Sequence, residues 1–208
     1  DLAMYNAKRA GKNQLSFYNS VMQEQALQAM VLEDELRRAL QRREFVLMFQ
    51  PIVSLTSGKN IKFEALIRWQ HPERGLLAPG SFIDIAEQTG LIVPVGYWVI
   101  EAACEFIQQQ YQHGVPVRPV AVNLSVCQLR EPDLACKIER IMAHLKVPPS
   151  LLELEITESM LMENVELAMT LINQLQQLGI RISIDDFGTG YSSLSQLRQL
   201  PFNSLKID

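Results

Sequence analysis

Four segments of this chain alternate apolar and polar side chains with a period of two, and this pattern constrains the fold more than any other feature. The segments are "FEALIRW" (63–69), "LELEITE" (152–158), "RISID" (181–185) and "SLKID" (204–208). Successive side chains of a β-strand point to opposite faces, so each segment predicts a strand with one apolar and one polar face. A flat parallel sheet covered by helices on both sides would need two apolar faces. In a barrel, the outer face meets helices and the inner face points into the lumen, with functional side chains at the carboxyl ends of the strands.

Helical stretches separate the strands, which indicates parallel βα units. The clearest helix begins after Asn164, a good N-cap, and ends before Gly179, a good C′ residue. Another long helix is expected from about Ser20 to Arg43. The predicted fold class is α/β, a TIM-like (β/α) barrel that is C-terminally truncated, with about six of eight strands present. The strand-like runs are 44–53, 60–69, 118–125, 151–159, 180–187 and 203–208.

Polar side chains gather where successive strands end. The carboxyl ends of barrel strands surround one opening, so these side chains should converge. Several carboxylates at one mouth would repel each other strongly at low dielectric, and a bound cation would relieve that repulsion. Oxygen ligands suit Mg²⁺ or Mn²⁺ better than zinc, and adjacent acids could reach two ions, as in two-metal phosphoester cleavage. Acids at strand ends also commonly cap the next helix, which is an alternative for one or two of them. The residues are Glu64, Asn123, Glu155, Asp185, Asp186 and Lys206.

Composition narrows the partners and the location. The net charge of -4 argues against binding of DNA or RNA polymers, which need a basic surface. The three cysteines form no CxxC pair and indicate reduced thiols in a cytoplasmic protein. No stretch reaches the roughly 18 continuous apolar residues of a membrane helix, so we expect no membrane contact within this chain. Its ends look cut, so we expect a piece of a longer protein, which could be membrane-anchored through further N-terminal domains.

The motifs together resemble the EAL family of cyclic-di-GMP phosphodiesterases. The order and spacing of the motifs agree with those of the family over residues 32–208, whereas "EAL" alone would not indicate the family. The opening "AMYNAKRAGKN" with "FY" resembles the C-terminal end of a GGDEF (diguanylate cyclase) domain, which assigns residues 1–19 to that domain and 20–31 to a helical linker. The EAL motifs are "EAL" (64–66), "QPIV" (50–53), "VNLS" (122–125), "ELEITES" (153–159), "DDFGTGYSSL" (185–194) and "LKID" (205–208).

The resemblance implies an EAL-type barrel that hydrolyses cyclic di-GMP to linear pGpG with two Mg²⁺ or Mn²⁺ ions, and a homodimer through the EAL domain. It implies that the loop "FGTGYSS" (187–193) rearranges beside the ions. Lys206 would hold the attacking water or a phosphate oxygen, and Glu158 would steady that loop. By role, the catalytic residues are Lys206, Glu158 and Glu64, the metal ligands are Glu64, Asn123, Glu155, Asp185 and Asp186, and the substrate-binding residues are Gln50, Leu66, Arg68 and Asp208.

Two other functions are open at this point. The first is a receptor that binds cyclic di-GMP without cutting it; the acids and "DDFG" are intact, which favours the enzyme. The family's last two strands carry a further catalytic Glu and a Gln that would lie beyond Asp208, so this fragment alone is expected to be inactive. The more distant alternative is a class I aldolase-like barrel with Lys206 as Schiff-base lysine, a chemistry that has no need of converging acids.

Overall fold

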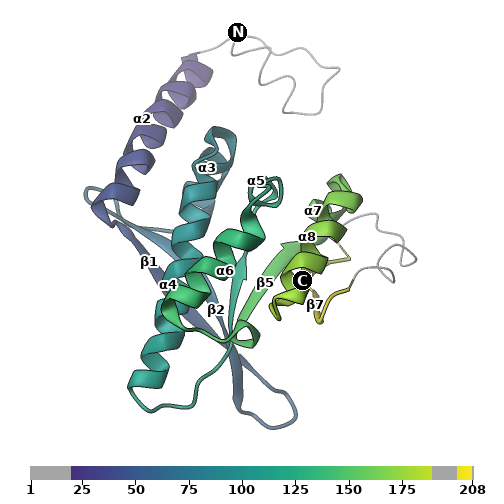
Figure 1. Ribbon diagram of the computed structural model, residues 1–208. Coiled ribbons are helices and arrows are strands. Elements are labelled where there is room, and N and C mark those ends of the chain that lie inside the picture. Colours follow the sequence, from purple (N-terminus) through teal and green to yellow (C-terminus); the bar gives the residue numbers. More distant parts are fainter. Residues whose placement is uncertain (1–19, 189–200, 208) are drawn as a thin grey trace.

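A computed structural model describes residues 20–188 and 201–207 of the 208-residue chain. Helices separate β2 and β3 from β4, β4 from β5, and β5 from β6 (Figure 1). The strands are β1 (Phe45–Val53), β2 (Asn60–His71), β3 (Gly75–Leu77), β4 (Val120–Asn123), β5 (Leu152–Thr157), β6 (Arg181–Phe187) and β7 (Ser204–Ile207). The helices are α2 (Ser20–Arg42), α3 (Ile83–Thr89), α4 (Ile92–Gln112), α5 (Val126–Leu129), α6 (Leu134–Leu145), α7 (Glu158–Glu163) and α8 (Val165–Gln177), with 3-10 turns η1 (Pro79–Ser81) and η2 (Pro149–Leu151).

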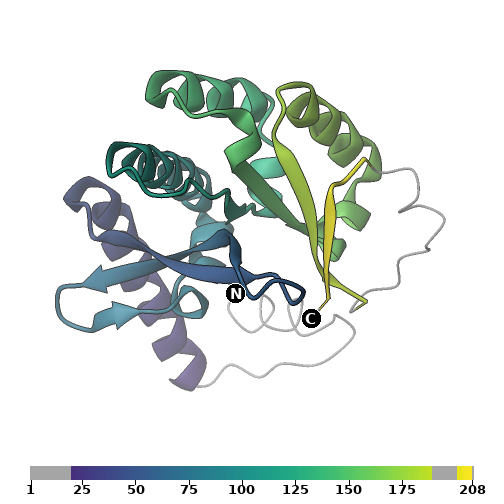
Figure 2. The same cartoon turned by 90° about the horizontal axis from the view of Figure 1, so that it is seen from below.

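The described strands form one sheet in the order β1-β2-β4-β5-β6-β7, with β3 paired to β2. The strands from β2 through β4, β5 and β6 to β7 are parallel, while β1 and β3 run antiparallel to β2. The sheet curls, and α4, α6 and α8 cover its outer side (Figure 2). All six predicted strands are present. The prediction missed β3, because three residues are too few to reveal an alternation.

Helix α8 shows how the sequence sets these elements. The Asn164 side chain accepts a hydrogen bond from the Leu167 N–H at 3.1 Å, which satisfies a donor that the first helical turn leaves free. Gly179 follows the helix with φ 88°, a left-handed conformation that glycine adopts without a Cβ penalty. The predicted start and end of this helix are therefore confirmed. Its buried side chains, which hold it against the sheet, are Ala168, Leu171, Ile172 and Leu175.

The alternation of the sequence corresponds to two different environments. On the outer face of β5 and β6, Leu154, Ile156 and Ile182 are fully buried under the helices. The opposite parity faces the inside of the curve. There, Glu153 and Glu155 are also buried, although they carry carboxylates. The inner face is thus a buried polar surface, which requires its groups to be paired.

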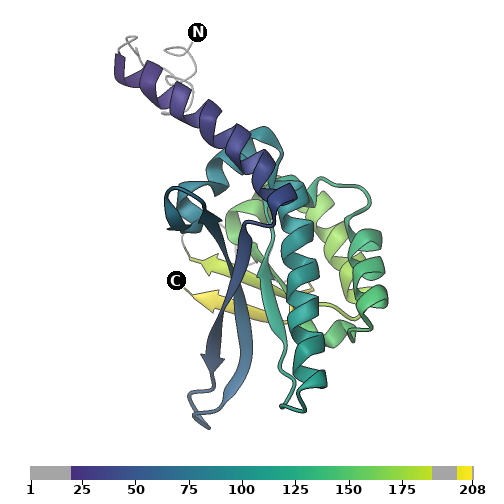
Figure 3. The ribbon, with the colours of Figure 1, turned by 90° about the vertical axis from the view of Figure 1, so that its left-hand side faces the viewer.

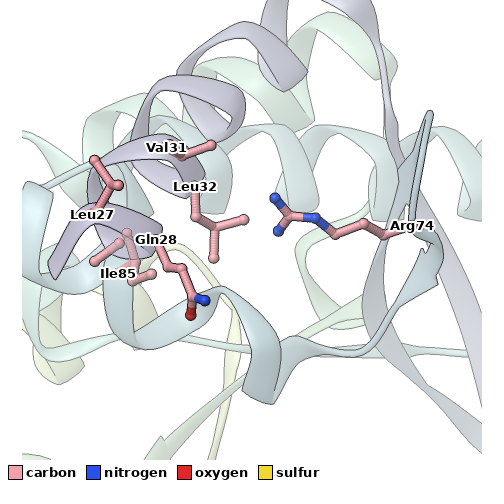
Figure 4. Close-up of a pocket in the computed structure, with 7 residues that line it drawn as sticks. Leu27, Gln28, Val31, Leu32, Arg74 and Ile85 are labelled. Atoms are coloured by element: carbon pink, nitrogen blue, oxygen red, sulfur yellow. The ribbon is translucent and has the colours of Figure 1, made fainter. Parts of the chain in front are cut away.

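Helix α2 confirms the long helix expected from about Ser20, and only part of it is packed. Leu36 and Ala39 are fully buried, whereas Leu27 is 62% exposed, and the N-terminal half projects from the body (Figure 3). A hollow of about 570 Å³ lies between this half and α3 (Figure 4). It is lined by Leu27, Gln28, Ala29, Val31, Leu32, Arg74 and Ile85. The GGDEF tail predicted for residues 1–19 lies outside the described residues. In the part of the chain that is described, no helix is long and apolar enough to cross a membrane.

Candidate functional site

Lys206 lies at the centre of the candidate site. Its Nζ atom is 2.7 Å from Glu155 Oε2, 2.8 Å from Asp185 Oδ2 and 3.3 Å from Glu64 Oε2. These residues come from β7, β5, β6 and β2, so the curl of the sheet brings together the C-terminal halves of β5, β6 and β7 and the middle of β2. The convergence expected from the sequence is therefore present for Glu64, Glu155, Asp185 and Lys206, which we call the carboxylate cluster.

Asn123 joins this cluster from the end of β4. Its Nδ2 atom donates a hydrogen bond to Glu64 Oε1 at 3.1 Å. The register of the sheet places Asn123 opposite Glu155 on β5, which explains why the two reach the same opening. Because the amide nitrogen is bound to Glu64, the amide oxygen of Asn123 is the atom that remains to accept or coordinate.

The cluster stabilises a charged lysine. Burial alone would lower the pKa of Lys206, but hydrogen bonds to Asp185 and Glu155 and the charges of Glu155 and Glu64 outweigh it and raise that pKa above its ordinary value. A raised pKa favours the charged ammonium form of this lysine. Burial raises the pKa of Glu155, and the hydrogen bond and charge of Lys206 oppose that rise.

The donor set suits a hard divalent cation. Within the described residues, no group of three or more acids, cysteines or histidines is arranged as a ready metal site, and three acids instead surround the Lys206 ammonium. Glu155 Oε1, however, is buried and has no hydrogen-bond partner among the described residues. A buried carboxylate oxygen without a partner is costly, and coordination would satisfy it. Carboxylate and amide oxygens are the ligands of Mg²⁺ and Mn²⁺, so the residues fit such an ion.

The end of β6 carries the two adjacent acids in different settings. Asp185 is part of the cluster, while Asp186 is exposed and has φ 53°. Aspartate is one of the few non-glycine residues that tolerates this left-handed conformation. The Asp186 N–H donates to Asp185 Oδ1 at 3.0 Å, which holds the Asp185 carboxylate. The two acids thus have different backbone conformations and exposure, and a role of Asp186 as metal ligand stays a prediction.

Glu158 reaches the same segment from the start of α7. It is buried, and its Oε2 atom accepts the Gly188 N–H at 2.8 Å. This contact agrees with a residue that steadies the chain after Asp186. The rest of the expected loop, residues 189–200, lies outside the described residues.

Gln50 and Arg68, two of the predicted substrate-binding residues, lie on the neighbouring strands β1 and β2. Gln50 is exposed on β1 and stands opposite Glu64 in the sheet register. The Arg68 guanidinium donates to the backbone oxygen of its neighbour Ile67 at 2.8 Å, and the structure does not bring it into the carboxylate cluster. Asp208 is outside the described residues.

A cavity of about 530 Å³ adjoins the cluster and has both Leu66 and Asn123 in its wall. Glu87 also lines it; burial and the charge of Asp84 raise the pKa of this carboxyl. Cavities of this size hold small ligands with most of their surface covered. The sequence analysis named Leu66 as a substrate contact but did not identify Glu87, since no motif or periodicity marks it.

Four further polar side chains lie inside the sheet, and the sequence analysis did not single them out. They form a layer below the carboxylate cluster, and we call them the lower layer. The alternation of apolar and polar residues places them on the inner face, and this was the only sequence feature that could have identified them. They are Lys62, Glu153, Ser183 and Ser204.

Comparison with known proteins decides the family. The profile of the EAL domain matches residues 33–208, which is most of the chain. This chain belongs to the EAL domain family. Phosphodiesterases of the EAL family depend on divalent metal ions.

Two curated relatives illustrate the EAL likeness. The chain is 43% identical over 208 residues to the bifunctional diguanylate cyclase/cyclic di-GMP phosphodiesterase MucR of Pseudomonas aeruginosa, covering 100% of this chain and 30% of MucR. It is 40% identical over 208 residues to the cyclic di-GMP phosphodiesterase PdeR of Escherichia coli, covering 100% of this chain and 31% of PdeR. The chain therefore spans about a third of the length of these relatives.

Solved EAL structures agree with the fold. The PaMucR phosphodiesterase in complex with c-di-GMP matches with a TM-score of 0.82 and 44% identity, covering 86% of this chain and 72% of that one. The FimX EAL domain from Pseudomonas aeruginosa bound to c-di-GMP matches with a TM-score of 0.77 and 25% identity, covering 86% and 71%. Both support the TIM-like architecture predicted from the alternation of the strands.

Proposed function

We propose that this EAL domain hydrolyses cyclic di-GMP to linear pGpG in a divalent metal-dependent reaction. The observation that carries the proposal is the Lys206 ammonium surrounded by Glu64, Glu155 and Asp185 on the inner face of the curled sheet. Relatives at 43% and 40% identity are named as cyclic di-GMP phosphodiesterases, which supports the choice of substrate.

Metal-binding roles follow from the donor atoms. Together they would bind two Mg²⁺ or Mn²⁺ ions. The candidate ligands are Glu64, Asn123, Glu155, Asp185 and Asp186. Such ions supply an activated water and neutralise charge on the phosphoryl oxygens. Among the described residues, Glu155 Oε1 has no hydrogen-bond partner, and the amide of Asn123 uses its nitrogen toward Glu64, so Glu155 Oε1 and the Asn123 amide oxygen are candidates to receive a cation.

The chain's own groups position the reacting phosphate. The bond between phosphorus and the 3′ oxygen of one ribose breaks, a water oxygen bonds to phosphorus, and the product carries a 5′ phosphate and a 3′ hydroxyl. The Lys206 ammonium is fixed by carboxylates, so it could orient the water or hold a phosphoryl oxygen without reorganising. The cavity beside Asn123 would take a guanine, whose N–H edge could donate to Glu87. Gln50, Leu66, Arg68 and Asp208 remain candidate substrate contacts.

The aldolase reading is disfavoured by the same geometry. An imine-forming lysine must lose its proton, and the carboxylates raise the pKa of Lys206 instead. Homodimerisation through the EAL domain and a cytoplasmic location stay predictions from the resemblance and the composition.

The first test replaces Lys206 by alanine in the natural full-length protein. We expect kcat for pGpG formation to fall on the order of a hundredfold or more, because one preorganised charge is lost at the reacting phosphate. Binding of cyclic di-GMP, measured with Ca²⁺ to suppress turnover, should fall much less. Chromatography of the products gives kcat, and calorimetry gives the binding constant. Lys59→Ala, at an exposed lysine in the β1–β2 turn, is the matched control.

Three outcomes would contradict the assignment. Parental kcat in Lys206→Ala would remove the lysine from the chemistry. Tight binding of cyclic di-GMP without any pGpG from the parent protein would favour the receptor alternative. Borohydride trapping of a carbonyl substrate on Lys206 would favour the aldolase.

A further inference from the structure

The lower layer stands in a fixed relation to the carboxylate cluster. Each of its members precedes a cluster residue by two positions on the same strand, so both side chains point to the same face of the sheet. The pairs are Lys62 with Glu64 on β2, Glu153 with Glu155 on β5, Ser183 with Asp185 on β6 and Ser204 with Lys206 on β7. The four strands that supply the cluster are therefore the four that supply the lower layer.

Hydrogen bonds join these four strands to one another. Lys62 Nζ lies 2.5 Å from Glu153 Oε1. The Ser204 hydroxyl donates to the same Glu153 oxygen at 3.2 Å and lies 3.1 Å from the Ser183 hydroxyl. Glu153 is 3% exposed and Ser183 is fully buried, so water cannot easily replace these contacts.

Apolar side chains could fill this layer and stabilise the fold as well as the polar ones. The inside of a TIM barrel is usually filled by branched apolar side chains, which pack without hydrogen bonds. A buried ion pair is often no more stabilising than apolar residues of similar volume, because both charges lose their hydration. The outer faces of β5 and β6 already supply an apolar core through Leu154 and Ile182. A polar layer at this depth therefore calls for another explanation.

We propose that the lower layer is a positioning layer for the carboxylate cluster. Its directional hydrogen bonds fix the spacing of β2, β5, β6 and β7 one pleat below the cluster, and so fix the distances among Glu64, Glu155, Asp185 and Lys206. The Lys62 ammonium also balances the Glu153 carboxylate, so the layer adds no net charge beneath the acids above it. Lys62 and Glu153 are thus positioning residues, and this inference rests on the proposed metal-dependent function.

The decisive variant removes the ion pair as a whole, Lys62→Met with Glu153→Leu, in the natural full-length protein. Replacing both partners leaves no lone buried charge, so the thermal midpoint should hold or rise. Mn²⁺ affinity by calorimetry should fall by about ten- to a hundredfold, as it does when groups that orient metal ligands are lost. Turnover should show a similar loss in kcat with little change in KM. Ser204→Ala should act in the same direction with a smaller effect.

A matched control removes an ion pair elsewhere. Glu33→Leu with Arg37→Met deletes the pair on α2 and should leave Mn²⁺ affinity unchanged.

Parental Mn²⁺ affinity and kcat in the folded Lys62/Glu153 double variant would overturn the proposal. If that variant does not fold, the double variant Ser204→Ala with Ser183→Ala takes its place, and its Mn²⁺ affinity and kcat are measured in the same way. A parent that binds Mn²⁺ but forms no pGpG would refute the proposed hydrolysis, while the Mn²⁺ affinities would still decide the positioning role. A parent that binds no Mn²⁺ would overturn both.

Discussion

Burial decides how single ionisable side chains of this domain behave, and the cysteines illustrate it. Cys104 is fully buried in α4, while Cys136 is exposed on α6. Burial, followed by the charges of Glu101 and Glu105, raises the pKa of the Cys104 thiol to about 12. The thiolate is the reactive form of cysteine, so Cys104 is unreactive at neutral pH both because it is protonated and because it is covered. All three cysteines are free thiols in the structure, which agrees with the reduced thiols expected from the sequence.

Alkylation should therefore be selective. With iodoacetamide at pH 8 we expect labelling of Cys136 in the folded protein and none of Cys104, since pH 8 lies well below a thiol pKa of about 12. Peptide mass spectrometry measures the label at each position. Cys136→Ser should remove that signal, and urea should make Cys104 reactive. Modification of Cys104 before unfolding would show that its environment is more open than the structure indicates.

Helices α4 and α5 meet so closely that one position admits only a hydrogen atom. A Cβ built on Gly96 would lie 2.1 Å from Gln128 Nε2. Gln128 is 1% exposed, and its Oε1 atom accepts from both the N–H and the hydroxyl of Ser125 in the capping box of α5. The side chain therefore cannot move aside without losing the cap.

We expect Gly96→Ala to lower the free energy of unfolding by about 1–3 kcal/mol, the usual cost of overpacking a buried site. Urea denaturation measures this. Gly80→Ala is the matched control, because a Cβ there meets nothing within 4 Å. Shortening Gln128 to alanine in the Gly96→Ala background should recover part of the loss. A Gly96→Ala protein as stable as the parent would mean that Gln128 repacks at no cost.

At the scale of the whole molecule, the carboxylate cluster is a local excess of negative charge held by the fold. Glu64, Glu155 and Asp185 outnumber the one ammonium they share. Several strands, far apart in the sequence, must stay together for these acids to lie side by side. A cation that binds the cluster therefore binds the folded chain in preference to the unfolded chain, and couples metal binding to stability.

Thermal denaturation should report this coupling. Mn²⁺ at about a hundred times its dissociation constant should stabilise the folded state by about 2.7 kcal/mol, which corresponds to a rise in Tm of about 5–10 °C for a domain of this size. Chelation should reverse the rise. Asp185→Asn should abolish most of it, and an equal rise in that variant would place the bound ion elsewhere.

Much of this architecture was predictable, because apolar and polar residues alternate with a period of two in the sequences of the strands. The alternation around Glu64, Glu155 and Asp185 predicted both the strands and the face on which these acids meet. The lower layer was harder to recognise. Glu153 and Ser183 have the same parity as the cluster, but nothing local distinguishes a buried hydrogen-bonded group from a solvated one. That distinction depends on which strands become neighbours, as does the pairing of Lys62 with a residue 91 positions away.

The anchoring of β7 has a consequence for how such a sequence can change length. Asn203 fixes this strand against β6, since it donates from its N–H to the Ile182 carbonyl and accepts the Ile182 N–H on its side chain, both at 2.8 Å. A deletion of one residue between Asn203 and Lys206 would turn the lysine outward and bring an apolar neighbour to the acids, because a slip of one position exchanges the two faces. Descendants of this gene should therefore keep the length of the segment between Asn203 and Lys206 free of odd-numbered changes.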